Sequence, residues 1–285
     1  MSVRFETKPN FFIVGTAYGN AKNQPVLLLH GGGQTGYSWG DTAKILAQNG
    51  YYAIALDARG HGDSSWSANA DYLTDALVDD LRAVIKQVGG KPALIGASMG
   101  GITSLIAEGE SKISVASTVI LVDIAPKAEQ KGIERIFAFM SANMNSGFAT
   151  IAEAAEAVAA YLPHRPKTDD TGRLEKNLRF RNGRWYWHWD PAMLQVWQNS
   201  TVSERIEYEQ RLFTAAQNLT VPTLIVRGGI SDVVSERVMA EFLDAVPQVR
   251  SFTVAGAGHM VAGDSNHSFT NAVVDFLKEV YPAQT

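Results

Sequence analysis

The most constraining feature of this sequence is a serine placed between two glycines, from Gly96 to Gly100, in the pattern G-x-S-x-G. The apolar run at residues 93–95 predicts a buried strand before it, and the apolar spacing after residue 101 is typical of a helix. A serine at a turn between a strand and a helix is the arrangement of a nucleophile elbow, in which a strained turn lifts the hydroxyl clear of the sheet. A glycine-rich turn without any chemistry has the same short pattern. The rest of the chain must therefore decide whether Ser98 is a nucleophile.

Predicted strands alternate with predicted helices over most of the chain, which is typical of a mostly parallel, doubly wound α/β sheet with helices on both faces. The eight predicted strands lie at residues 3–7, 11–18, 26–29, 52–56, 93–95, 117–122, 223–226 and 250–254, the first two as an antiparallel pair. The clearest predicted helices lie at residues 39–48, 74–88 and 269–280. In such sheets the functional groups gather beyond the carboxyl ends of the strands. The polar residues that follow these ends are His30, Asp57, Ser98, Asp123, Asp232 and His259.

The alternation breaks between residues 127 and 220, where no clear buried strand is found. Residues 163–189 contain seven Lys/Arg against three Asp/Glu and end in an aromatic cluster, Trp185 to Trp189. We interpret residues 127–220 as a helical cap, or lid, inserted into a core domain formed by residues 1–126 and 221–285. Basic stretches with aromatic residues also occur on nucleic-acid-binding surfaces. The net charge of −4 favours a solvated basic face, with aromatic side chains over a pocket.

A serine nucleophile needs a base that takes its proton and a carboxylate that holds the base in the correct tautomer. The sequence supplies Ser98, then Asp232, then His259, in that order. Asp123 is the alternative acid, because it also follows a buried strand. We expect Asp232 to orient His259, because it follows the strand directly before the histidine strand in a turn that contains Gly228 and Gly229. Asp123 is then expected to form the hinge into the cap.

The glycine run after His30 suits a second element of such a site. A developing oxyanion needs two backbone N–H groups aimed at it, and glycine permits the close approach. We expect these groups to come from Gly32 and from Met99, although a glycine-rich turn that only starts a helix has the same appearance. Gly33 and three aromatic residues are expected to contact the substrate. The aromatic residues are Trp39 from below the pocket and Trp187 and His188 from the cap.

Taken together, these motifs resemble the α/β-hydrolase superfamily along most of the chain, with only the cap outside the match. The segments that carry the resemblance are residues 30–33, 57–62, 96–101, 229–232 and 258–260. The resemblance implies an α/β-hydrolase fold and a capped enzyme similar to carboxylesterases, lactonases, C–C bond hydrolases and cofactor-free haloperoxidase-like enzymes. It also implies that residues 57–62 form a structural turn beside the site. Dehalogenases and epoxide hydrolases of this family carry aspartate where this chain has Ser98, which argues against both activities.

Composition excludes several other classes. The chain has 25 Lys/Arg against 29 Asp/Glu and no cysteine, so disulfides and thiolate chemistry are excluded, and neither nucleic acid nor a membrane is an expected partner. No Walker A motif, no His-Glu-x-x-His motif and no carboxylate-rich metal loop is found, so no metal or other cofactor is expected. The first ten residues contain no apolar segment typical of a signal peptide, so none is expected, and no apolar run approaches the roughly 20 residues of a membrane span. We expect a cytoplasmic monomer or homodimer that acts on a small molecule.

Two classes of function remain. The first is a serine hydrolase (EC 3 class, esterase-like) of small to medium carboxylic esters, lactones or related acyl compounds, acting through a Ser-His-Asp triad and an acyl-enzyme. The second is a ligand-binding receptor on the same fold. A C–C bond hydrolase or a cofactor-free peroxidase-type activity in the same site is a further alternative. The complete set of Ser98, Asp232 and His259 favours the serine hydrolase.

Overall fold

The computed structural model describes residues 1–163, 172–198, 201–264 and 266–283. Its central feature is a sheet to which the described residues contribute eight strands, in the order β1-β2-β4-β3-β5-β6-β9-β10. The strands are β1 (Ser2–Lys8), β2 (Phe11–Tyr18), β3 (Pro25–Leu29), β4 (Tyr52–Leu56), β5 (Ala93–Ala97), β6 (Thr118–Val122), β9 (Thr223–Gly228) and β10 (Arg250–Val254). β1 and β2 pair antiparallel, β2 pairs antiparallel with β4, and all other pairs are parallel. The predicted fold class and the eight strands are confirmed.

The strand order reverses direction at β3, which lies between β4 and β5. In open α/β sheets, ligands bind beyond the carboxyl ends of the strands at such a switch point. Leu29 of β3 pairs with Gly96 of β5, so the loop that starts at His30 and the turn at Ser98 leave the sheet side by side. The chain topology thus brings the glycine run and the serine to one place.

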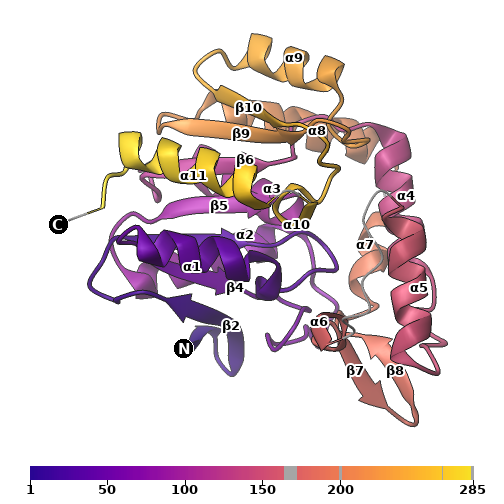
Figure 1. The fold of residues 1–285 in the computed structure, drawn as a ribbon. Helices are drawn as coiled ribbons and strands as arrows, with labels where there is room; N and C mark the ends of the chain where they lie inside the picture. The colour runs from indigo at the N-terminus through magenta and orange to yellow at the C-terminus, as the bar shows by residue number, and fades with distance from the viewer. Residues whose placement is uncertain (164–171, 199–200, 265, 284–285) are drawn as a thin grey trace.

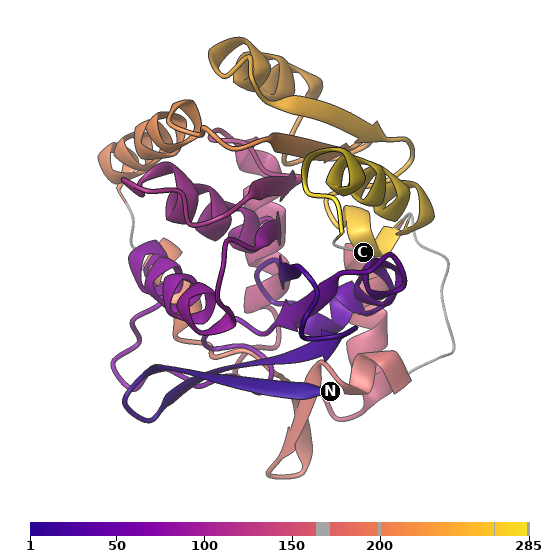
Figure 2. The ribbon, with the colours of Figure 1, turned by 90° about the vertical axis from the view of Figure 1, so that its left-hand side faces the viewer.

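Helices cover both faces of the sheet (Figures 1 and 2). On one face lie α2 (Thr74–Val88), α3 (Met99–Gly109) and α8 (Val202–Gln217), and α9 (Glu236–Ala245) contributes to the same core cluster. On the other face, η1 (Gly36–Trp39), α1 (Gly40–Gln48), α10 (Val261–Asp264) and α11 (Asn266–Val280) contribute to a second core cluster. Continuous apolar runs such as Val26 to Leu29 are required here, because a strand covered on both faces presents no side chain to water.

Most of the segment between β6 and β9, from α4 to α7, forms a layer at the edge of the sheet, seen on the right in Figure 1. It contains α4 (Gln130–Ser141), α5 (Ile151–Tyr161), α6 (Gly172–Glu175), β7 (Leu178–Arg181), β8 (Arg184–Trp187) and α7 (Met193–Gln198). The hairpin β7-β8 departs from the prediction of a purely helical cap. Its turn is Asn182-Gly183, with φ angles of 51° and 79°. Asn-Gly favours the two-residue turn that joins antiparallel strands, because both residues tolerate positive φ.

Helix α8 lies inside the stretch that we predicted to be cap, yet it packs on the core. Leu212, Ala215 and Ala216 belong to the cluster that contains the sheet and α3. A Cβ on Gly109 of α3 would lie 2.1 Å from the Ala215 carbonyl oxygen, so the two helices touch along their backbones. The division into core and cap stays a proposal, and on this packing we place the end of the cap before α8.

Candidate active site

Ser98 occupies the turn between β5 and α3 with φ 47° and ψ −117°. Such a backbone conformation is strained for a residue other than glycine and is found mainly at functional sites. The flanking glycines make the turn possible: a Cβ on Gly96 would lie 2.3 Å from the Gly100 carbonyl oxygen, and one on Gly100 would lie 2.5 Å from that of Leu29. The side chain is half-buried. The local geometry is therefore that of a nucleophile elbow.

His259 follows β10 and meets an aspartate that the sequence analysis did not select. Its Nδ1 lies 2.7 Å from Oδ2 of Asp123, and the Asp123 side chain is completely buried while that of His259 is 9% exposed. The carboxylate also accepts hydrogen bonds from Gly228 N–H (2.8 Å) and Ser231 Oγ (2.5 Å). Because a carboxylate only accepts hydrogen bonds, His259 Nδ1 carries the proton and Nε2 is left as the basic nitrogen.

The prediction that Asp232 orients His259 is wrong in this structure, and so is the hinge role expected for Asp123. Ser231 points inward to Asp123, whereas Asp232, the next residue, points outward, and its side chain is 42% exposed. Asp232 accepts two hydrogen bonds from the Arg135 guanidinium of α4, at 2.6 and 2.8 Å. This hydrogen-bonded cation lowers the pKa of the Asp232 carboxyl. Asp232 therefore joins the core to the cap.

The two backbone N–H groups predicted for an oxyanion hole are the unpaired ones in their loops. In the described segments 31–33 and 98–100, the other N–H groups all have acceptors: Gly31 donates to Gln34 Oε1 (3.0 Å), Gly33 to His61 Nε2 (3.0 Å), Ser98 to the Val122 carbonyl (3.1 Å) and Gly100 to that of His30 (3.2 Å). Gly32 and Met99 remain. A Cβ on Gly31 would lie 3.3 Å from the Ser98 Cβ, so the two loops are in contact.

Three buried histidines bond the glycine run, a role that the sequence analysis predicted for none of them, although it expected His188 to contact substrate. His30 Nε2 accepts a hydrogen bond from Ala58 N–H (2.9 Å), His61 Nε2 from Gly33 N–H (3.0 Å), and His188 Nδ1 from Gly62 N–H (2.8 Å). The ring centroids of His30 and His61 are 4.9 Å apart, and those of His61 and His188 are 5.8 Å apart. A nitrogen that accepts from an amide cannot carry a proton, so each ring is neutral with a fixed tautomer.

Stability should therefore fall in mild acid. Burial lowers the pKa of His30 to about 4 and that of His188 well below its usual value. It also lowers the pKa of His61 to about 3, although the negative charges of Asp57 and Asp190 act to raise it. In the unfolded chain the three histidines take up protons below pH about 6.5, whereas in the folded chain they do so only at lower pH. Their contribution to the free energy of unfolding is therefore complete above pH about 6.5 and is lost as the pH falls toward the folded-state pKa values. We expect about 1.4 kcal/mol less unfolding free energy per pH unit for each histidine.

Urea denaturation between pH 7 and 4.5 measures this slope. His61→Gln offers the matched control, because its Oε1 can still accept from Gly33 but it does not titrate. The unfolding free energy of the variant should change less steeply with pH than that of the parent, by the contribution of one histidine. Equal slopes for parent and variant would mean that His61 does not contribute to the acid sensitivity.

Of the side chains predicted to contact substrate, Trp39 lies elsewhere. It is 1% exposed and packs against Phe269 of α11, with ring centroids 5.9 Å apart, in the core on one face of the sheet. That prediction is wrong because η1 turns the Trp39 ring inward. Trp187 is 5% exposed and stacks on Trp189 at 4.9 Å, within the apolar cluster of the cap. His188 is fully buried and bonds backbone groups.

The cap side chains that face the glycine run are Met140 and Trp189, the second of which belongs to the aromatic cluster expected over the pocket. A Cβ on Gly33 would lie 3.2 Å from Met140 Cε and 3.4 Å from a Trp189 ring carbon. A Cβ on Gly32 would lie 3.8 Å from the Met140 sulfur. The cap thus closes over the expected oxyanion hole with a thioether and an indole ring.

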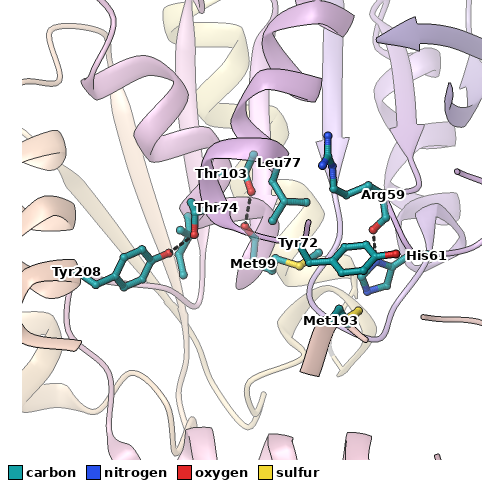
Figure 3. A pocket seen from close by; sticks show the side chains of 10 residues that line it. Arg59, His61, Tyr72, Thr74, Leu77, Met99, Thr103, Met193 and Tyr208 are labelled. Carbon is teal, nitrogen blue, oxygen red and sulfur yellow. Dashed lines mark hydrogen bonds between the residues drawn. The ribbon is translucent and has the colours of Figure 1, made fainter. Parts of the chain in front are cut away.

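A cavity of about 40 Å³ has Met99 in its lining (Figure 3). Its lining comes from both core and cap: Arg59, His61, Tyr72, Thr74, Leu77, Met99, Ile102, Thr103, Met193 and Tyr208. At one end the Thr74 and Tyr208 hydroxyls are 2.8 Å apart. Met99, whose N–H is expected to form part of the oxyanion hole, and His61, which bonds Gly33, both line this cavity. Because the lining is drawn from distant parts of the chain, no single motif indicated it.

The described residues contain no group of three or more His, Cys, Asp or Glu side chains placed to hold a metal ion. None of the helices among them is both long and apolar enough to cross a membrane.

Comparisons with known proteins agree with this geometry. The family model described as "Alpha/beta hydrolase family" matches residues 26–272. Similar curated proteins include Esterase Rv0045c of Mycobacterium tuberculosis (27% identity; 87% of this chain and 80% of that protein) and Esterase YbfF of Escherichia coli (28%; 93% and 97%). The solved structure of E-2-(acetamidomethylene)succinate hydrolase has the same fold, with a TM-score of 0.81 and 23% identity over 98% of this chain and 99% of that one.

Proposed function

Because the chain belongs to the alpha/beta hydrolase family, we propose that it is a serine hydrolase of small to medium carboxylic esters or related acyl compounds, with Ser98, His259 and Asp123 as its triad. The observation that carries the proposal is the 2.7 Å hydrogen bond between His259 Nδ1 and the buried Asp123 carboxylate. It fixes the tautomer that a base needs, and it lies beside a strained serine turn with two unpaired N–H groups.

The reaction follows from these groups. Ser98 Oγ attacks the substrate carbonyl while His259 Nε2 takes its proton, and Asp123 stabilises the imidazolium that forms. The oxyanion of the tetrahedral intermediate accepts hydrogen bonds from Gly32 and Met99 N–H. Collapse expels the alcohol, which takes the proton from His259, and leaves Ser98 acylated. A water molecule then repeats the sequence and releases the acid.

An ester rather than another acyl substrate is supported by the relatives, several of which are named esterases. A short acyl or alcohol group in the substrate is supported by the small cavity that Met99 lines. Its volume of about 40 Å³ has room for only a few methylene groups or water molecules. Leu77 and Ile102, which line the cavity together with Met99, provide apolar walls.

The test is turnover of a graded series of p-nitrophenyl esters, with a lactone and a β-diketone alongside, before and after treatment with a fluorophosphonate. We expect hydrolysis that is fastest for short acyl chains, that is abolished by the reagent, and that leaves the label on the Ser98 peptide. Binding of esters without turnover would favour a ligand-binding receptor. Cleavage of the diketone in preference to esters would favour a C–C bond hydrolase.

Filling the cavity should narrow the substrate range. Ile102→Phe replaces an aliphatic side chain in the lining of the cavity by a larger aromatic ring and leaves the site groups in place. We expect kcat/KM for hexanoyl and longer esters to fall about tenfold, the scale of the discrimination that one methylene achieves in an apolar pocket, with the acetyl ester changed less than twofold. Ile113→Phe is the matched control, because Ile113 is 78% exposed. An unaltered chain-length profile in Ile102→Phe would remove the cavity from the substrate site.

A further inference from the structure

Three consecutive peptide units of the glycine run are each held by a different buried histidine. His30 Nδ1–H donates to the Gly31 carbonyl at 2.7 Å, which holds the unit that contains Gly32 N–H. His61 Nε2 accepts from Gly33 N–H at 3.0 Å, which holds the next unit. His188 Nε2–H donates to the Gly33 carbonyl at 3.3 Å, which holds the third.

The second nitrogen of each ring bonds the backbone of residues 57–64, the loop to which His61 itself belongs. His30 accepts from Ala58 N–H (2.9 Å), His61 donates to the Arg59 carbonyl (3.0 Å), and His188 accepts from Gly62 N–H (2.8 Å). All three rings are at least 99% buried. Each imidazole is thus a rigid spacer between two backbones, with one donor and one acceptor at opposite sides of the ring.

This loop is itself held in shape. The Asp57 carboxylate accepts from Gly36 N–H (2.7 Å) and Asp63 N–H (3.0 Å), and a Cβ on Gly62 would lie 2.0 Å from its Oδ2. Residues 57–64 therefore offer a fixed template to the glycine run. Three glycines in a row have more conformational freedom than any other tripeptide, so without such ties the direction of Gly32 N–H would vary.

We propose that His30, His61 and His188 are positioning residues. Their hydrogen bonds fix the backbone of the glycine run relative to residues 57–64, so that Gly32 N–H points at the oxyanion. In a trans peptide the N–H and C=O point in opposite directions, so the His30 bond to the Gly31 carbonyl sets the direction of Gly32 N–H. The ring of His188 belongs to the cap, directly after β8, so docking of the cap completes the hole. This inference rests on the proposed function.

The test uses paired amide variants at each histidine, because asparagine places its amide near the Nδ1 position and glutamine near the Nε2 position. His30→Asn, His61→Gln and His188→Gln can keep the bond to the glycine run. His30→Gln, His61→Asn and His188→Asn can keep only the bond to residues 57–64. We expect the second member of each pair to have a tenfold to hundredfold lower kcat than the first, with KM within about twofold, since losing an oxyanion donor outright costs about 10²–10³ in kcat.

The required amide length differs between His30 and the other two, which a general loss of packing would not reproduce. Affinity for a trifluoromethyl ketone, which forms a tetrahedral adduct, should fall in parallel with kcat/KM, as expected for a transition-state contact. His267→Asn, an exposed site on α11, is the control and should leave both unchanged. If both members of each pair lose the same activity in proportion to their thermal stability, the histidines are structural only and the proposal fails.

A second measurement does not depend on whether the variants fold. Imidazole ¹⁵N chemical shifts of the parent enzyme at pH 7 should report three neutral rings, protonated at Nδ1 in His30 and His61 and at Nε2 in His188. A charged ring or the opposite tautomer at any of the three would overturn the assignment. If fluorophosphonate fails to label Ser98, the proposed function is lost. If labelling and ester turnover are normal but the pairs do not differ, only the positioning role is lost.

Discussion

Replacing Ser98 by alanine is expected to lower kcat for ester hydrolysis by about 10⁶, the scale found when the serine of a comparable triad is removed. The substitution removes one oxygen atom from a half-buried side chain. No hydrogen bond of the described part of the chain uses the Ser98 Oγ, and alanine keeps the same Cβ in the strained turn. The loss should therefore be one of chemistry, because the two N–H groups and the pocket remain. Stopped assays at high enzyme concentration measure the residual rate.

Ser203→Ala provides the control, since Ser203 is an exposed serine on α8 that bonds Glu207. Parent and both variants should melt within a few degrees of one another, and only Ser98→Ala should escape fluorophosphonate labelling. Ester hydrolysis at the parental rate by a folded Ser98→Ala enzyme would rule out the acyl-enzyme mechanism and with it the proposed function.

The sheet could be predicted because its strands are covered on both faces. Runs such as Val119 to Val122 must be apolar at every position, and such runs are easily recognised in a sequence. The cap was harder. β7 and β8 each have four residues, and half of their side chains are charged or exposed, so no buried run marks them. The Asn182-Gly183 turn was the available signal for this hairpin.

The acid of the proposed triad could not be chosen from the sequence because the choice depends on side-chain direction. Asp123 and Asp232 both follow buried strands near the same edge of the sheet. Asp123 takes a positive φ of 49°, which an L-residue adopts only when its surroundings compel it, and its carboxylate lies among the loops that follow β9 and β10. Residues 231 and 232 point in opposite directions, so that Ser231 faces Asp123 and Asp232 faces Arg135. Neither property has a signature in residue type.

The three positioning histidines illustrate a different limit. His30, His61 and His188 are far apart in the chain, and only contacts in three dimensions show that they hold successive peptides. A sequence pattern can locate a glycine run that suits an oxyanion hole. Of the side chains proposed to restrict the freedom of that run, His30 directly precedes it, whereas His61 and His188 come from elsewhere, His188 from the cap.

Asp123→Asn is expected to lower kcat by about 10⁴, as found for the corresponding change in a protease triad. The structure gives the reason. Oδ1 of Asp123 accepts from Gly228 N–H, so the amide oxygen of asparagine must take that position and its NH₂ must face His259. The NH₂ then donates to Nδ1 and forces the proton onto Nε2, which leaves no basic nitrogen for Ser98. Steady-state kinetics at saturating ester measure the loss.

Asp232→Asn is the matched control, because the same chemical change falls in the loop after β9, the strand that neighbours β6 in the sheet. It removes a partly exposed ion pair with Arg135, which is worth at most about 1 kcal/mol of stability, and it leaves the His259–Asp123 bond in place. We expect kcat to stay within about threefold of the parent and the melting temperature to fall slightly. The comparison is decisive in either direction. If Asp232→Asn proved the crippled variant and Asp123→Asn kept its activity, the acid of the working enzyme would be Asp232, and the loop of residues 229–234 would have to turn over during catalysis.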